Sequence, residues 1–223
     1  MKRNWILIVG FFILLLAGFW YFLFAGTDYY KSKLPVLSYV QPFTFTDQND
    51  HPVTQKNVAG KVYVAEYFFT TCKGICPMMN ENMKTVYDVY KNDPGFAIIS
   101  HTCMPETDSV PLLKAYEAKM FMSSNNKQQT ANWFFVTGIK DSLYKMARQS
   151  YLLDNEKNNS VNIKDQFIHT QFFSLVDKQG RVRGIYDGLK PDELTKLKGD
   201  IAGLLKEKEP AAGFSISPFS NNP

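Results

Sequence analysis

The sequence has only three cysteines among its 223 residues, which leaves one possible pair and one residue over. So sparse a set cannot form the disulfide framework that holds many small secreted domains together. The sequence also has no internal repeat, no glycine-rich phosphate loop and no G-x-S-x-G elbow. These absences argue against a repeat architecture, a P-loop nucleotide site and an α/β-hydrolase active site.

A strong charge of one sign is missing as well. The net charge is only +4, and the lysines are scattered rather than gathered in blocks, so we expect no nucleic acid as a partner. Hydrophobic residues make up 45% of the chain and aromatic residues 15%, which is ample for a packed core. A length of 223 residues accommodates one domain of ordinary size with appendages.

The N-terminus carries a long apolar run. Residues 1–4 are short and basic, and residues 5–25 are uncharged and almost wholly apolar. A run of this length matches the roughly 20 residues that a helix needs to cross the hydrocarbon core, and Lys2 and Arg3 predict a cytoplasmic N-terminus. We therefore expect a transmembrane helix at 5–25, a single-pass anchor in the cell inner membrane, then a linker at 26–36 and the remaining chain on the periplasmic side. A cleaved signal peptide fits less well, because the run is too long and no clear A-x-A site follows it.

Strand-like and helix-like segments alternate through the rest of the chain. Apolar runs rich in β-branched and aromatic residues predict buried strands, and apolar residues at helical spacing predict helices between them. We expect strands at 62–69, 96–101 and 133–136, helices at 78–90, 109–120 and 141–151, hairpins at 43–54 and 172–186, and a last helix at 191–205. This order predicts an α/β domain with a mixed sheet and flanking helices over residues 37–206. Residues 207–223 are expected to be largely disordered.

Two cysteines stand where a buried strand is expected to turn into a helix. The segment Cys72-Lys73-Gly74-Ile75-Cys76-Pro77 follows the predicted strand, and proline suits the first helical turn because the amide proton that it lacks would be unpaired there. Across such a turn both sulfurs can point at the same spot, and the positive end of the helix dipole favours the thiolate form. Two adjacent thiolates suit Cu(I) or zinc, and they can equally close into a disulfide. An inert disulfide or two buried thiols are the structural alternatives.

The residues around these cysteines resemble a known family. The segment from Glu66 to Pro77 is similar to the copper-site segment of the Sco/SenC family, the thioredoxin-like copper proteins that assemble cytochrome c oxidase. The resemblance covers residues 37–206 and includes three further segments in the family's order and spacing, which are Ile99–Asp108, Asn132–Gly138 and Phe167–Gly180. It implies a thioredoxin-like fold with an added N-terminal hairpin, and one copper per chain as Cu(I) or Cu(II).

By this resemblance, His169 is the third copper ligand beside Cys72 and Cys76, because a histidine just ahead of the strand at 172–176 has that role in Sco-type proteins. Two thiolates and one imidazole give the low coordination number that Cu(I) accepts, and Cu(II) depends on the imidazole more strongly. Asp165 is a candidate to orient the imidazole as a hydrogen-bond acceptor.

Three residues near the second predicted strand are less convincing ligands. His101 and Cys103 lie two apart and so share a face of the sheet, and we interpret them as residues that fill a position near the sheet edge. Cys103 lies on a different segment from the motif and has no partner cysteine, so we expect copper binding without it. Met104 stands where many family members carry the first Asp of an Asp-Pro-x-x-Asp pattern. A role that the family gives to this Asp therefore cannot be transferred to this chain. The thioether of Met104 is instead a soft potential ligand near the site.

Two functions follow from these predictions. In the first, the protein is a membrane-anchored copper chaperone rather than an enzyme with turnover. It takes copper from an upstream donor and, by the resemblance, hands it to the copper-site subunit of cytochrome c oxidase. In the second, Cys72 and Cys76 act as a thiol–disulfide oxidoreductase that reduces a client's cysteines. The loop favours copper, because redox thioredoxins normally use C-x-x-C and need no histidine at position 169. A peroxidase is a weaker alternative, since no arginine lies close in sequence to the cysteines.

Overall fold

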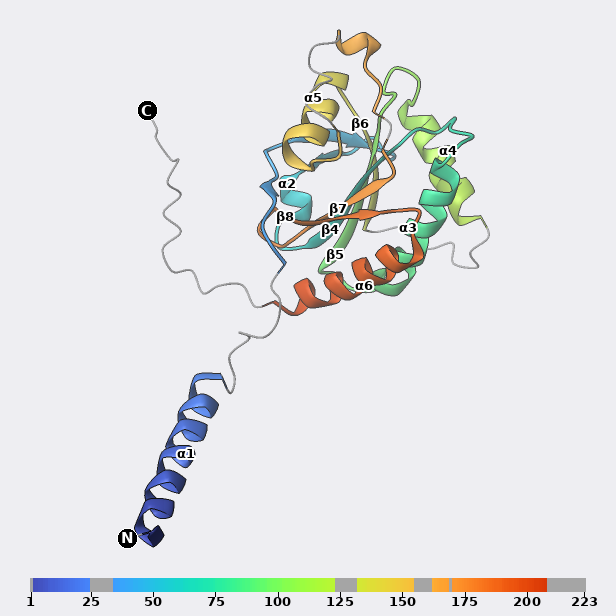
Figure 1. The fold of residues 1–223 in the computed structure, drawn as a ribbon. Coiled ribbons are helices and arrows are strands. Elements are labelled where there is room, and N and C mark those ends of the chain that lie inside the picture. The colour runs from blue at the N-terminus through green and yellow to red at the C-terminus, as the bar shows by residue number, and fades with distance from the viewer. Residues whose placement is uncertain (1, 25–33, 123–131, 155–161, 169, 208–223) are drawn as a thin grey trace, which may run out of the picture. The chain divides into compact units, whose positions relative to one another are not determined.

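The computed structural model describes residues 2–24, 34–122, 132–154, 162–168 and 170–207. The chain divides into two compact units, Met1–Leu34 and Pro35–Pro223. The first unit contains the helix α1 (Lys2–Phe24), drawn in dark blue in Figure 1. Within the described part of the chain, no helix is both long and apolar enough to cross a membrane. The transmembrane anchor expected at residues 5–25 is therefore not supported by the structure and stays a prediction. The tail predicted at 207–223 lies outside the described residues from 208 onward.

The described residues of the second unit form one mixed sheet, with eight strands in the order β1-β8-β7-β4-β5-β6-β2-β3. Strands β4, β5 and β6 run parallel to one another, whereas the hairpins β2–β3 and β7–β8 and the pair β4–β7 are antiparallel. The α/β class with a mixed sheet is confirmed. The strands are β1 (Ser38–Tyr39), β2 (Thr44–Asp47), β3 (Pro52–Thr54), β4 (Val62–Phe68), β5 (Phe96–Thr102), β6 (Trp133–Thr137), β7 (Phe172–Val176) and β8 (Arg181–Asp187).

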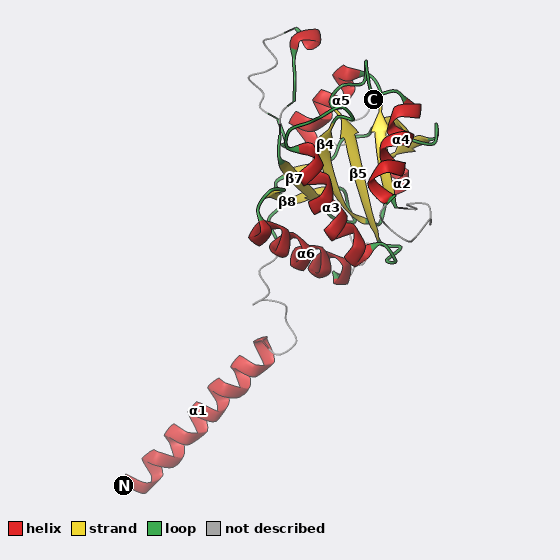
Figure 2. Ribbon diagram, turned by 90° about the vertical axis from the view of Figure 1, so that its right-hand side faces the viewer, coloured by secondary structure: helices red, strands yellow, loops and turns green. Residues whose placement is uncertain are grey.

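Helices cover both faces of this sheet (Figures 1 and 2). On one face Tyr67 of β4 belongs to the same hydrophobic cluster as Leu143 of α5. On the other face the ring of Phe68 lies 5.1 Å from that of Tyr116 in α4. Because successive side chains of β4 point to opposite faces of the sheet, α5 packs on one face and α4 on the other. The helices are α2 (Gln55–Val58), α3 (Cys76–Tyr90), α4 (Val110–Phe121), α5 (Lys140–Lys145), the π-helix η2 (Met146–Ser150), the 3-10 helix η4 (Ile163–Asp165) and α6 (Pro191–Lys206).

The region predicted as one helix at 141–151 differs in detail. It is helical, but α5 gives way to the π-helix η2, in which the backbone turns are wider. The N–H of Tyr151 donates to the carbonyl of Met146 at 3.0 Å, five residues earlier. Met146, Ala147 and Arg148 are buried in succession, more than the one-sided apolar stripe of an amphipathic surface helix would bury. Hydrophobic periodicity alone could not reveal this change of helix type.

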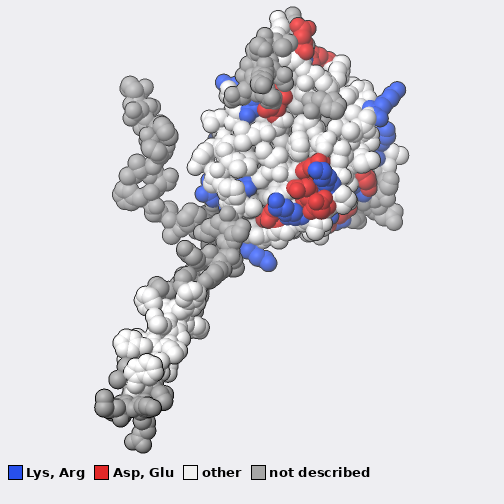
Figure 3. Space-filling view, viewed as in Figure 1, with Lys and Arg blue, Asp and Glu red and all other residues white. Residues whose placement is uncertain are grey.

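The central strands are buried along their whole length. Every residue of β4 and of β5 is buried, as expected for parallel strands with helices on both faces. On the face drawn in Figure 3, basic and acidic side chains lie at the surface and are interspersed. Several ionisable side chains are exceptions to that surface location, and two of them, Glu66 and His101, lie inside the sheet at 0% exposure.

Glu66 is held on the α4 side of the sheet. The hydroxyl of Ser100 donates to its Oε1 at 2.6 Å, and Nε1 of Trp133 donates to that hydroxyl oxygen at 2.9 Å. Its second oxygen, Oε2, has no hydrogen-bond partner among the described residues. Burial therefore raises the pKa of Glu66 to about 7, and the hydrogen bond from Ser100 only partly offsets this.

His101 lies on the opposite face, which makes the expected location near the sheet edge wrong. Strand β5 runs between β4 and β6, so its side chains point into packed interior. The imidazole stacks on the ring of Tyr67 at 4.9 Å, and its Nδ1 lies 3.2 Å from the carbonyl oxygen of Glu66. Burial lowers the pKa of His101 to about 3, so the ring is a neutral part of the core.

These two buried groups are expected to give opposite pH dependences of stability. The pKa of Glu66 is raised on folding, so the free energy of unfolding falls as the pH rises from 4.5 toward about 7. The pKa of His101 is lowered on folding, so the free energy of unfolding falls as the pH drops from 6.5 toward about 3. The free energy of unfolding of Glu66→Gln, measured relative to that of the unaltered chain, should thus be higher above neutral pH than at mildly acidic pH. For His101→Gln, the same relative free energy of unfolding should be higher at acidic pH than at neutral pH.

Urea unfolding of the unaltered chain and the two variants, on both sides of neutrality, measures these differences. A stability difference that is the same at both pH values for either variant would contradict the assigned shift of that group.

Candidate metal centre

Cys72 and Cys76 lie where β4 leads into α3, as predicted. Strand β4 ends at Phe68, and α3 begins at Cys76 with proline in its first turn. The N–H of Cys72 donates to the carbonyl of Phe69 at 3.2 Å, which closes a turn just beyond the strand. Cys72 is half-buried and Cys76 is buried, and both are free thiols. The strand–turn–helix geometry therefore presents one half-buried and one buried cysteine.

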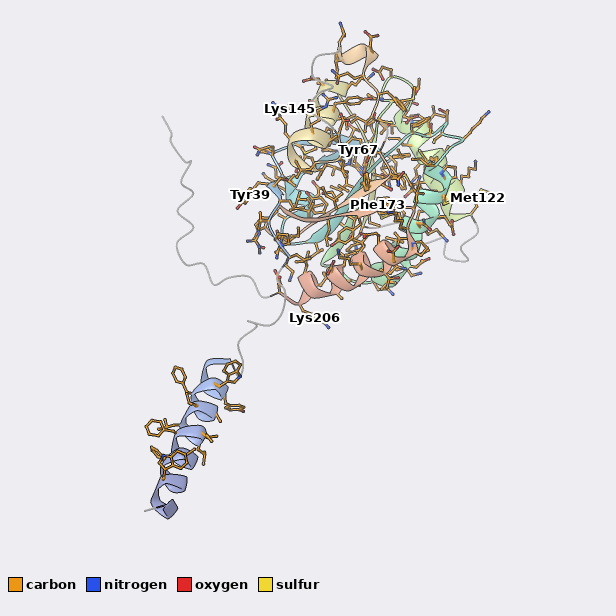
Figure 4. All side chains as sticks on the ribbon, viewed as in Figure 1. Tyr39, Tyr67, Met122, Lys145, Phe173 and Lys206 are labelled. Atoms are coloured by element: carbon orange, nitrogen blue, oxygen red, sulfur yellow. The ribbon has the colours of Figure 1, made fainter. Side chains whose placement is uncertain are left out.

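All three cysteines line one small cavity. Its volume is about 20 Å³, which is enough for one water-sized occupant. Ile168 and Thr170, the sequence neighbours of position 169 on either side, also line it. His169 itself lies outside the described residues. The remaining lining residues are Tyr67, Phe68, Phe69 and Ile75, and Figure 4 labels Tyr67 in the interior of the domain.

The other residues considered as ligands lie in different surroundings. Asp165 is exposed in η4, and the role predicted for it toward the imidazole of His169 lies outside the described residues. Met104 packs against the hydrophobic core and does not line the cavity. Among the described side chains, no three of His, Cys, Asp and Glu form a group that could hold a metal ion.

Cys103 lies closer to the motif than its position in the sequence suggests. Its N–H donates to the carbonyl of Phe68 at 2.9 Å, which places it beside the end of β4. It belongs to a separate segment, as stated above, but the parallel pairing of β4 with β5 brings that segment to the same cavity. The expectation that copper binds without Cys103 stays a prediction.

Burial dominates the ionisation of the inner thiols. It raises the pKa of Cys76 far above the ordinary value, with a further rise from the hydrogen bond to Cys72 and a partial reduction from a backbone hydrogen bond at Phe69. Burial, followed by the charge of Asp108, raises the pKa of Cys103 to about 12. The expected preference for thiolate at the helix N-terminus is thus wrong for Cys76, because desolvation outweighs the helix dipole.

Asp108 is a supporting residue that the sequence did not single out. It is fully buried and accepts the backbone N–H of Thr70 at 3.1 Å, together with the hydroxyls of Thr70 and Thr102. It therefore ties the end of β5 to the loop that enters the cysteine motif. The sequence could have pointed to Asp108, because it is the last Asp of the Asp-Pro-x-x-Asp pattern. This chain retains that residue, although Met104 replaces the first Asp.

A mixed sheet with flanking helices, and a cysteine pair at the start of a helix that follows a central strand, define a thioredoxin-like protein. The chain belongs to the SCO1/SenC family, whose model matches residues 32–205. It is 29% identical over 189 residues to the SCO1 protein homolog of Bacillus subtilis (strain 168), and this match covers 84% of the chain and 93% of that protein.

Solved structures agree with this assignment. BsSco, a member of the Sco family of cytochrome c oxidase assembly proteins, is 29% identical, and the match covers 78% of this chain and 98% of that one with a TM-score of 0.63. ScoI of Bradyrhizobium japonicum, solved with copper bound, shares the fold at 20% identity, with 75% and 100% coverage and a TM-score of 0.56.

In the reduced, metal-free protein, Cys72 should react with iodoacetamide before the other two cysteines. It is half-buried, whereas Cys76 and Cys103 are buried and have raised thiol pKa values, so they present little thiolate to the reagent. Mass spectrometry after short labelling times at neutral pH gives the order of reaction. Labelling in denaturant, where all three thiols are exposed, serves as the control. Modification of Cys76 ahead of Cys72 would show that the assigned burial is incorrect.

Proposed function

We propose that this protein is a copper chaperone that delivers copper for the assembly of cytochrome c oxidase. The observation that carries the proposal is the small cavity at the start of α3, which is lined by the Cys72 and Cys76 thiols and by both neighbours of position 169. We assign Cys72, Cys76 and His169 as the ligands of one copper ion per chain. The family membership and the copper-bound relatives support this assignment.

The chemistry of these residues fits copper. Thiolates are soft ligands that select Cu(I), and an imidazole adds the donor on which Cu(II) depends more strongly. The cavity is small, and its other described walls are largely aromatic and aliphatic, so it favours an ion that sheds its water. Because the pKa of the Cys76 thiol is raised, uptake of copper must release a proton there.

The unequal exposure of the two thiols suits delivery of a bound ion. Cys72 is half-buried and can be approached by a ligand of another protein, whereas Cys76 is 6% exposed. Transfer can then proceed by ligand exchange that begins at Cys72, while Cys76 retains the ion until the last step. We propose the copper-site subunit of the oxidase as the recipient and an upstream protein as the copper donor.

We further propose that the protein is anchored in the cell inner membrane in a single pass. The support is the uncharged run at residues 5–25 in the sequence, which falls within the helix α1 up to Phe24. Lys2 and Arg3 favour a cytoplasmic N-terminus. The copper-binding domain at 37–206 would then work on the periplasmic side.

Thiol–disulfide exchange is the second candidate function, and one specific observation favours it. Cys72 and Cys76 are free thiols that line the same cavity, so their sulfurs are available to each other for a disulfide. Such a protein would reduce the cysteines of a client, and it would need two sulfurs but no imidazole.

Both motif cysteines should be required for tight Cu(I) binding. The two sulfurs face one cavity, so removing either leaves a single thiolate. Anaerobic titration against a competing chelator should show one equivalent of Cu(I) in the unaltered chain, and none retained by Cys72→Ser or Cys76→Ser. Cys103→Ala is the control and should keep the full stoichiometry. Retention of one equivalent by either serine variant would make the ligand assignment wrong.

His169→Ala should separate the two functions. Without the imidazole, Cu(I) should bind more weakly and the Cu(II) absorption spectrum should be lost, while the Cys72–Cys76 disulfide should still form and reduce reversibly. In cells that lack the native protein, this variant should fail to support oxidase assembly. Full rescue at normal expression would instead favour thiol–disulfide exchange as the function.

A further inference from the structure

The hydroxyl of Tyr144 joins the cysteine cavity to the segment that precedes position 169. It donates to the backbone carbonyl of Cys103 at 2.8 Å, with the carbonyl of Gln166 as a second, longer acceptor at 3.3 Å. It also accepts the backbone N–H of Ile168 at 3.4 Å. Cys103 and Ile168 both line the cavity, so one side-chain atom connects two of its walls.

Arg148 supports the same segment from the next turn of the helix. Its Nη2 donates to Oε1 of Gln166, and its Nε forms an ion pair with Asp154 at 2.7 Å. The guanidinium also lies 5.6 Å from the centre of the Tyr144 ring. The Arg148 and Asp154 side chains are only 5% and 9% exposed, so this charge is buried and paired rather than displayed to solvent.

Tyr144 and Arg148 reach the segment from consecutive helical elements. Tyr144 lies in α5 and Arg148 in η2, four residues further along, a spacing that places two side chains on one helix face. Arg148 is buried in η2, and arginine is almost never buried without a partner. Single π-turns within helices are frequent at functional sites. Here the π-helix carries the cation that binds Gln166.

We propose that Tyr144 and Arg148 are positioning residues, which hold the segment 166–168 against the cysteine cavity and thereby set the place of the third copper ligand at position 169. This inference rests on the proposed function, because it assumes that residue 169 binds copper. It assigns no contact with the metal to either side chain. Burial raises the pKa of Tyr144 to about 12, so its hydroxyl keeps the proton that it donates at neutral pH.

Tyr144→Phe removes the hydroxyl and keeps the ring. In the metal-free protein, the amide proton of Ile168 loses its acceptor and should exchange faster with deuterium, as measured by NMR. In the copper protein, the Cu(II) affinity should fall at least on the order of 10-fold, the loss typical when a residue that supports a metal ligand is removed. The Cu(II) absorption and EPR spectra should change, whereas Cu(I) should still bind at one equivalent.

Two further variants keep the test informative. Gln166→Ala removes one acceptor of Arg148, the side-chain oxygen of Gln166, but not Asp154, its partner in the ion pair. It should weaken Cu(II) binding in the same direction even if Tyr144→Phe unfolds. Tyr90→Phe is the matched control, because the Tyr90 hydroxyl also donates to a backbone carbonyl, that of Lys198, but between α3 and α6. Tyr90→Phe should leave the Cu(II) spectrum unchanged.

The outcomes distinguish this inference from the function on which it rests. Loss of the Cu(II) spectrum in His169→Ala, with unchanged spectra and affinities in folded Tyr144→Phe and Gln166→Ala, overturns the positioning role alone. An unchanged Cu(II) spectrum in His169→Ala overturns the ligand assignment and the positioning role with it. Loss of the Cu(II) spectrum in His169→Ala, together with weaker Cu(II) binding in Tyr144→Phe and Gln166→Ala and an unchanged Tyr90→Phe, supports both.

Discussion

The parallel pairing of β4 with β5 is the constraint on which the site depends. It aligns Val62–Phe68 with Phe96–Thr102 residue by residue, so the carboxyl ends of both strands finish at the same edge of the sheet. The loop with the cysteine motif follows the end of β4, and the segment with Cys103 and Asp108 follows the end of β5. Asp108 then bonds to Thr70 across this edge, which fixes the approach to Cys72. Without this register, the cysteine motif and the segment that supports it would not meet.

Local patterns in the sequence were sufficient for the elements and for the motif's surroundings. The apolar run before Cys72 and the proline after Cys76 correctly predicted the strand, the turn and the helix. The contribution of Cys103 to the cavity wall could not be predicted in this way, because it depends on which strands pair and in what register. The same limit applies to His101, whose place in the interior follows from the position of β5 between two other strands.

The ionisation of the thiols shows a second limit of sequence reasoning. A helix N-terminus favours thiolate by a modest electrostatic term, and that term can be read from the motif. Desolvation is larger and acts in the opposite direction at Cys76, but it depends on side chains that line the same cavity, such as Phe68, Phe69 and Ile168. Those side chains come from two separate parts of the chain. The sign of the pKa shift was therefore a property of the assembled fold.

The lining of the cavity has a consequence for the kinetics of copper release. Around the cysteine sulfurs its described walls are largely aromatic and aliphatic, so they offer a departing ion no oxygen ligands in place of a sulfur. If copper binds there as proposed, a soft ligand of a partner that reaches the half-buried Cys72 can replace a protein sulfur directly, which favours associative exchange over loss to bulk water. Retention of copper would then depend on which ligands can reach the site as well as on affinity.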